Sequence, residues 1–118
     1  MFGIGYIETV PTPNLQASLG LKPGVVTSGD SLDYTDKCLE IMRDGGAAVK
    51  EMEAASIAWT AQLFKKPVVC IKAITDIVDG DRATQDEFLE NLNSAAAALQ
   101  GVLPRVIEFI GGRAVSEL

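Results

Sequence analysis

The feature of this sequence that most constrains its fold is a nearly unbroken apolar run, rich in β-branched residues, at positions 68–74. Such a run is typical of a strand covered on both faces, as in the parallel sheets of α/β proteins. A helical pattern at 54–65 precedes it, and Pro67 cannot continue that helix. The inner face of that helix is predicted to carry Ala54, Ile57, Ala58, Ala61 and Phe64. The sequence therefore predicts an α/β fold with a parallel sheet.

The rest of the chain continues this alternation, and the predicted order is βαβαβα. Proline and glycine in the first 23 residues indicate irregular structure, with a short helix at 14–19. Strands are predicted at 24–28 and 47–52, with a helix at 35–43 between them. That helix is expected to point three side chains inward: Cys38, Leu39 and Met42.

A last helix is predicted to begin at a capping box formed by Thr84 and Glu87. Gly101 and Pro104 are expected to break or kink it before the apolar stripe resumes. Its inner face is predicted to carry Phe88, Leu92, Ala95, Ala96, Leu99 and Leu103.

Charge and composition exclude several classes of function. The 118 residues carry 16 acidic and 10 basic side chains, a formal charge of −6, and no basic stripe is interleaved with aromatic residues. Nucleic acid and anionic membranes are therefore not expected as partners. Histidine is absent, which excludes Ser-His-Asp and Cys-His catalysis and histidine-ligated metal within this chain.

The sequence also indicates where the protein resides. No apolar run approaches the roughly 20 residues that cross a bilayer, and the first residues lack the basic flank and long apolar stretch of a signal peptide. Cys38 and Cys70 are expected to be reduced core thiols, with a disulfide as the alternative. We therefore expect a cytoplasmic protein.

Acidic residues follow two of the predicted strands. Glu53 lies just beyond the strand at 47–52, and Asp76 lies just beyond the strand at 68–74. If these strands are neighbours, both side chains are expected to face one cleft, because ligands bind beyond the carboxyl ends of parallel strands. A poorly solvated carboxyl group can retain a proton, which suits a general acid. The alternative is structural, with Glu53 stabilising a helix N-terminus and Asp76 bonding its own turn.

Asp79 and Asp81 raise the question of a calcium or magnesium loop. They lack the D-x-D-x-D-G order and the distal bidentate glutamate of such loops, so we expect no metal. No cofactor is expected either.

Four motifs occur in order along the chain: Ser-Gly-Asp at 28–30, Glu-Met-Glu-Ala-Ala at 51–55, Lys-Ala-Ile-Thr-Asp-Ile-Val-Asp-Gly-Asp at 72–81 and Asp-Glu-Phe-Leu at 86–89. Together they resemble the C-terminal half of the 5'-methylthioadenosine/S-adenosylhomocysteine nucleosidases, in the nucleoside phosphorylase superfamily. The details at 28–33 and 79–81 look most like the plant-type branch. The resemblance implies a three-layer αβα fold, here partial, with a mixed, largely parallel sheet.

The resemblance also implies roles for the matching residues. Asp76 corresponds to the acid that donates a proton to N7 of adenine, and Glu53 to the glutamate that holds the ribose hydroxyls. Met52 packs beside the sugar and Glu51 lies near it. Thr75 is the small hydroxyl residue before the acid. The apolar side chain of Leu32 and the backbone around Asp33 bracket adenine. An oxocarbenium-like transition state needs both an acid on the base and a negative charge near the sugar.

By the same resemblance, residues 1–118 correspond to the C-terminal half of one nucleosidase domain, without its N-terminal half. The half that is not matched carries the glutamate that positions the attacking water, and Glu8 cannot be assigned to that role. We therefore expect the chain to be inactive alone. The complete protein is expected to be a homodimer that hydrolyses 5'-methylthioadenosine, and S-adenosylhomocysteine as a further substrate, in methionine salvage.

Two alternatives stay open at this point. A phosphorylase of the same superfamily would use phosphate instead of water, although the acids at 51 and 53 disfavour an anion near the sugar. A storage-type or truncated relative would be catalytically silent, but such a protein is expected to lose the acids that this chain keeps.

Overall fold

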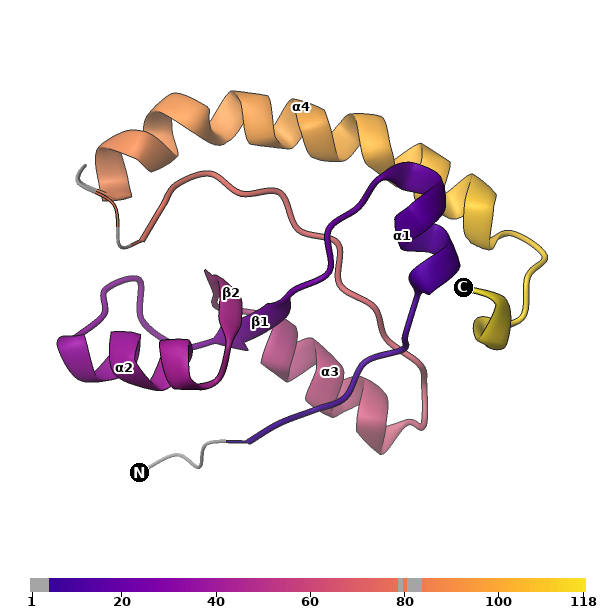
Figure 1. The fold of residues 1–118 in the computed structure, drawn as a ribbon, viewed down its shortest axis with the longest axis horizontal. Coiled ribbons are helices and arrows are strands. Elements are labelled where there is room, and N and C mark those ends of the chain that lie inside the picture. The colour runs from indigo at the N-terminus through magenta and orange to yellow at the C-terminus, as the bar shows by residue number, and fades with distance from the viewer. Residues whose placement is uncertain (1–4, 79, 81–83) are drawn as a thin grey trace. The chain divides into compact units, whose positions relative to one another are not determined.

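The computed structural model describes residues 5–78, 80 and 84–118, which form two compact units (Figure 1). The first unit contains the residues up to Pro11 together with Pro23–Cys70. The second contains Thr12–Lys22 and Ile71–Leu118. The predicted site residues are divided between these units, so each unit is described separately.

The first unit is built on a two-stranded parallel sheet of β1 (Val25–Ser28) and β2 (Ala47–Glu51). Helix α2 (Asp36–Asp44) connects the strands and packs on β2, and α3 (Ala54–Leu63) follows β2 and packs on β1. Ser28 pairs with Glu51 in the register, so both strands end at the same edge. The predicted strands and helices of this region are confirmed to within about two residues.

Helix α3 is mostly apolar, but only a narrow stripe of it is buried. Ala54 and Ala58, one turn apart, are the buried residues of the helix. The prediction that Ile57 and Phe64 also face inward is wrong, because these side chains are 58% and 70% exposed. The small alanine side chains let the helix approach the sheet, and the larger apolar residues lie on its other sides.

The predicted strand at 68–74 is not formed. Residues 65–77 contain no helix or strand, and Val10 N–H donates to the Val68 carbonyl over 2.8 Å. A strand is defined by a ladder to a neighbour, and the sheet of the described residues consists of β1 and β2. The element order is therefore α1, β1, α2, β2, α3, α4 and a final short 3₁₀ turn, not βαβαβα.

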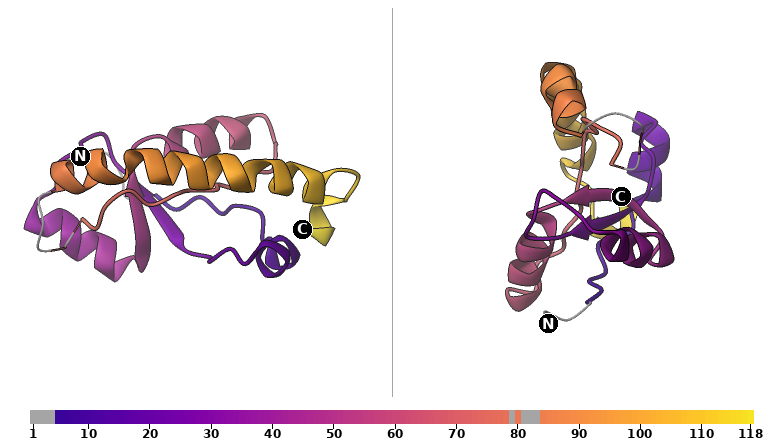
Figure 2. Two further views of the ribbon diagram at one scale, coloured as in Figure 1. Left: turned by 90° about the horizontal axis from the view of Figure 1, so that it is seen from above. Right: turned by 90° about the vertical axis from the view of Figure 1, so that its left-hand side faces the viewer.

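The second unit consists mainly of two helices, α1 (Pro13–Leu19) and the long α4 (Thr84–Ile110), which pack together (Figures 1 and 2). Its buried apolar residues are Leu15 of α1 and Val106 of α4. The Leu15 amide donates to the carbonyl of Leu118 over 2.7 Å, which ties α1 to the 3₁₀ turn at Val115–Glu117. Helix α1 confirms the short helix predicted at 14–19.

Helix α4 differs from its prediction in two ways. It continues through Gly101 and Pro104, so the predicted break does not occur, whereas the alternative of a kink stays a prediction. Four of the six side chains predicted to face inward are exposed: Phe88, Leu92, Ala96 and Leu103. The face turned toward the rest of its unit includes Asn91, Ala95 and Leu99, which are half-buried.

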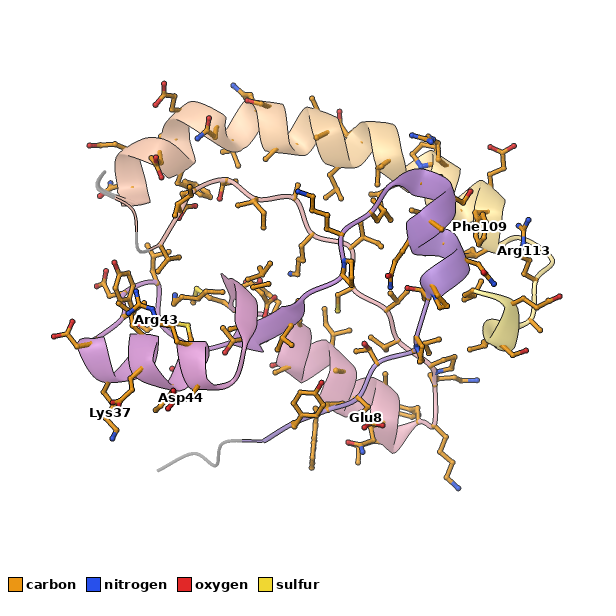
Figure 3. All side chains as sticks on the ribbon, viewed as in Figure 1. Glu8, Lys37, Arg43, Asp44, Phe109 and Arg113 are labelled. Carbon is orange, nitrogen blue, oxygen red and sulfur yellow. The ribbon has the colours of Figure 1, made fainter. Side chains whose placement is uncertain are left out.

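Arg113 caps the C-terminal end of α4. Its guanidinium lies 4.1 Å from the centroid of the Phe109 ring and donates to the Phe109 carbonyl (Figure 3). None of the helices in the described part of the chain combines the length and the hydrophobicity that a membrane crossing needs.

Candidate functional site

The predicted site residues fall into two groups, one in each unit. Leu32, Asp33, Glu51, Met52 and Glu53 belong to the first unit, and Thr75 and Asp76 belong to the second. The expectation that Glu53 and Asp76 share one cleft stays a prediction, since they lie in different units. Each group is nevertheless organised by its own hydrogen bonds.

Glu51 organises the start of α3 in the first unit. One carboxylate oxygen accepts a hydrogen bond from the hydroxyl group of Ser28, which lies directly opposite in the sheet. The other accepts the backbone N–H groups of Glu53 at 3.1 Å and Ala54 at 2.8 Å. The Ser28 hydroxyl oxygen in turn accepts the N–H of Ala55 at 2.9 Å. Glu51 and Ser28 thus satisfy the amide groups that a helix N-terminus leaves without partners.

Because Glu51 supplies these bonds, Glu53 is not needed to cap α3. Glu53 is the N-cap residue, but its side chain makes no capping hydrogen bond and is exposed. Met52, beside it, is 40% exposed. The structural alternative for Glu53 stays open, because a negative charge at the N-cap stabilises a helix without a hydrogen bond; its exposed side chain is also compatible with ligand binding.

Lys50 organises a second segment of the same unit. Its ammonium group donates to the carbonyl oxygens of Ser31 at 2.8 Å and Leu32 at 2.9 Å. These bonds hold the loop between β1 and α2, in which the Leu32 side chain is 70% exposed. Side chains alternate along a strand, so the neighbours Lys50 and Glu51 leave β2 on opposite faces. The end of β2 therefore fixes both the Leu32 loop and the start of α3.

In the second unit, Asp76 lies in a segment without regular structure, yet its surroundings are specific. The Thr75 hydroxyl donates to the Asp76 carboxylate over 2.5 Å. Asn91 Nδ2 of α4 donates to the Thr75 carbonyl over 2.9 Å, and Ile77 N–H donates to the Glu87 carboxylate over 3.0 Å. Both Thr75 and Asp76 are half-buried.

An open cavity of about 590 Å³ lies within the second unit. Residues 71–77 form one side of it and the inner face of α4 forms the other. Its wall is mostly apolar, with a few converging polar groups that include Asp76, Glu87 and Asn91. This combination is the usual composition of a small-molecule pocket.

Several other predictions concern thiols and metals. Both cysteines are free, but the prediction that Cys38 lies in the core is wrong, because it is exposed in the first turn of α2. A hydrogen bond from the Thr35 hydroxyl lowers the pKa of the Cys38 thiol. Asp79, Asp81 and the Thr84 side chain lie outside the described residues. Elsewhere in the described chain, no three His, Cys, Asp or Glu side chains are grouped to hold a metal ion.

Sequence reasoning missed the side chains that hold the site residues in place. Lys50 and Ser28 could have been noticed as polar groups at the ends of paired strands. The capping box of Thr84 and Glu87 stays a prediction, but the Glu87 carboxylate also accepts a hydrogen bond from the backbone of Ile77, which the sequence pattern does not indicate. Asn91 lies one turn after Glu87, and that i, i+4 spacing was the available signal.

Comparison with known proteins places the chain in context. Residues 12–108 match the model of the phosphorylase superfamily. Over its whole length, the chain is 46% identical to a 5'-methylthioadenosine/S-adenosylhomocysteine nucleosidase and 48% identical to a 5'-methylthioadenosine nucleosidase, both of Arabidopsis thaliana. It covers 46% and 44% of these proteins, so the chain spans about half the length of the curated relatives it matches.

Solved structures show the same relationship. The apo structure of the Arabidopsis thaliana 5'-methylthioadenosine nucleosidase matches 94% of this chain and 46% of its own, with a TM-score of 0.90 and 46% identity. A crystal structure of an MTA/SAH nucleosidase matches with a TM-score of 0.89 and 47% identity. The predicted α/β fold of the nucleoside phosphorylase type is therefore confirmed.

Proposed function

Because the chain belongs to the phosphorylase superfamily, we propose that it supplies the acid and the ribose-binding part of a nucleosidase site. The reaction is hydrolysis of the N-glycosidic bond of 5'-methylthioadenosine, with S-adenosylhomocysteine as a further substrate. The observation that carries this proposal is the half-buried Asp76, held beside a cavity in a chain 46–48% identical to two such nucleosidases.

Asp76 is the proposed general acid. When the bond between the sugar and adenine breaks, its electron pair moves onto the base. Protonation of adenine N7 by Asp76 makes the base a neutral leaving group. The hydrogen bond from Thr75 fixes one carboxylate oxygen and leaves the other for the base. This arrangement supports the assignment of Thr75 as a residue that orients the acid.

Glu53 is the proposed partner on the sugar side. Positive charge develops on the ribose as the base departs, and a carboxylate that binds the ribose hydroxyls stabilises it. The exposed position of Glu53, with α3 capped by Glu51 instead, supports this role. Met52 packs against the sugar. The Leu32 side chain and the backbone at Asp33 bracket adenine.

Residues 1–118 are proposed to need the rest of a nucleosidase domain for activity. The relatives are about twice as long as the matched region, and α3 exposes large apolar side chains that the rest of such a domain would cover, among them Trp59 and Leu63. Alone, we expect the chain to be inactive, marginally stable and prone to associate. The complete protein is proposed to be a homodimer that acts in methionine salvage in the cytoplasm, the last consistent with two free thiols.

The test is adenine release from 5'-methylthioadenosine. The 118-residue chain is assayed alone and after co-expression with the N-terminal part of the Arabidopsis nucleosidase, each with and without phosphate. We expect no release from the chain alone, and recovery on co-expression that does not depend on phosphate. Strict dependence on phosphate would show a phosphorylase instead. A stable complex of the two polypeptides that releases no adenine would show a catalytically silent relative.

A further inference from the structure

The segment that carries Asp76 is held by side chains of α4. Residues 71–77 form no strand, so no sheet ladder fixes their orientation in the described part of the chain. Figures 1 and 2 show this extended segment beside the N-terminal part of α4. Two α4 side chains, Glu87 and Asn91, contact its backbone.

The two contacts flank Asp76. Asn91 binds the carbonyl of Thr75, in the peptide group that precedes Asp76. Glu87 binds the N–H of Ile77, in the peptide group that follows Asp76. The peptide groups on both sides of the proposed acid are therefore hydrogen-bonded to the same helix. The two side chains that make these bonds are one helical turn, about 6 Å, apart.

The chemistry of these bonds suits positioning. A carboxylate that accepts from a backbone N–H makes a charge-assisted bond, stronger than one between neutral groups. The hydrogen bond from the Asn91 side-chain amide to the Thr75 carbonyl holds the segment at a second position. Glu87, Asn91 and Asp76 line the same cavity, and all three lie in the second unit. Neither Glu87 nor Asn91 needs to touch the base to control where Asp76 points.

We propose that Glu87 and Asn91 are positioning residues that aim the carboxyl group of Asp76 at the leaving base. This inference rests on the proposed function. Removing either contact is expected to lower kcat by about 10-fold to 100-fold with little change in KM, because a misplacement of about 1 Å can reduce a rate by that amount. For a substrate whose leaving group departs without protonation, kcat should not change in these variants.

The experiment uses Glu87→Ala and Asn91→Asp in the co-expressed protein described above. Asn91→Asp is nearly isosteric and loses the N–H donor, so it tests the proposal even if Glu87→Ala does not fold. Glu87→Gln keeps an acceptor oxygen and should restore much of kcat. Asn93→Asp, an exposed position two residues further along α4, is the matched control. Each protein is assayed on 5'-methylthioadenosine and on the p-nitrophenyl 5-methylthioriboside.

We expect both variants to slow adenine release while p-nitrophenolate release stays at the control rate. In the co-expressed protein, Glu87→Ala should also speed hydrogen exchange at the Ile77 amide, and Glu87→Gln should do so less. Adenine release at the control rate in either variant would overturn the proposal, and so would an equal loss on both substrates. If the unsubstituted protein forms its complex and releases no adenine, the proposed function fails, and this inference fails with it.

Discussion

The two units hold their site residues in different ways. In the first, Glu53 and the Leu32 loop leave the ends of a hydrogen-bonded parallel sheet, and the neighbouring β2 residues Lys50 and Glu51 fix them. In the second, Asp76 lies on a segment without a ladder, and single side-chain bonds from α4 fix it. The first unit adds the backbone ladder of β1 and β2 to its side-chain bonds, whereas the segment at Asp76 has side-chain bonds without a ladder. Single substitutions should therefore affect the second unit more strongly.

The largest expected effect is at the acid of the second unit. Asp76→Asn is nearly isosteric, so the fold should be kept, but the side chain can no longer release a proton. We expect kcat for 5'-methylthioadenosine in the co-expressed protein to fall by about 10²–10⁴, the usual contribution of a general acid. Turnover close to that of the unsubstituted protein would remove Asp76 from the mechanism.

A smaller loss is expected at Glu53 of the first unit. Glu53→Gln removes a charge-assisted hydrogen bond worth about 1.5–3 kcal/mol, so kcat/KM should fall by about 10-fold to 100-fold. A substrate without the 2'-hydroxyl should suffer a similar loss with the unsubstituted protein and little further loss with the variant. Losses that add in full would show that Glu53 does not bind that hydroxyl.

We expect the cap supplied by Glu51 to contribute to the free energy of unfolding. Glu51→Ala removes the acceptor for the first amides of α3, and loss of a cap typically costs about 0.5–2 kcal/mol in free energy of unfolding. Urea unfolding of the co-expressed protein measures the change, and Glu40→Ala, on an exposed position of α2, is the control. Equal midpoints for the two variants would show that the Glu51 bonds contribute nothing measurable.

The smallest effect is expected at Lys50. Lys50→Met frees the carbonyls of Ser31 and Leu32, but the ends of the loop remain anchored in β1 and α2. We expect faster hydrogen exchange across residues 31–34 and a rise in KM of only a few fold, since both bonds are exposed and water can replace them. Lys37→Met, whose parent side chain points away from its unit in Figure 3, is the control. A loss as large as that of the α4 variants would contradict the difference between the units.

The same contrast explains what could be predicted from the sequence. β1, α2, β2 and α3 depend on local periodicity and on caps such as Thr35, so their positions were predictable. The strand at 68–74 was wrongly predicted, because an apolar run specifies burial but pairing requires a neighbouring strand. The inner face of α4 was misplaced for a similar reason. The contacts of Glu87 and Asn91 with residues 75–77 join segments whose proximity no local pattern encodes.

The proposed function assigns Asp76 to the base and Glu53 to the sugar of the nucleoside. A crystal structure of the co-expressed protein with a 5'-methylthio C-nucleoside, whose bond between base and sugar cannot be hydrolysed, tests it directly. We expect the Asp76 carboxyl group within about 2.6–3.2 Å of N7 and the Glu53 carboxylate at the same distance from the ribose hydroxyls. A ligand bound by only one of these two side chains, or by neither, would contradict the claim.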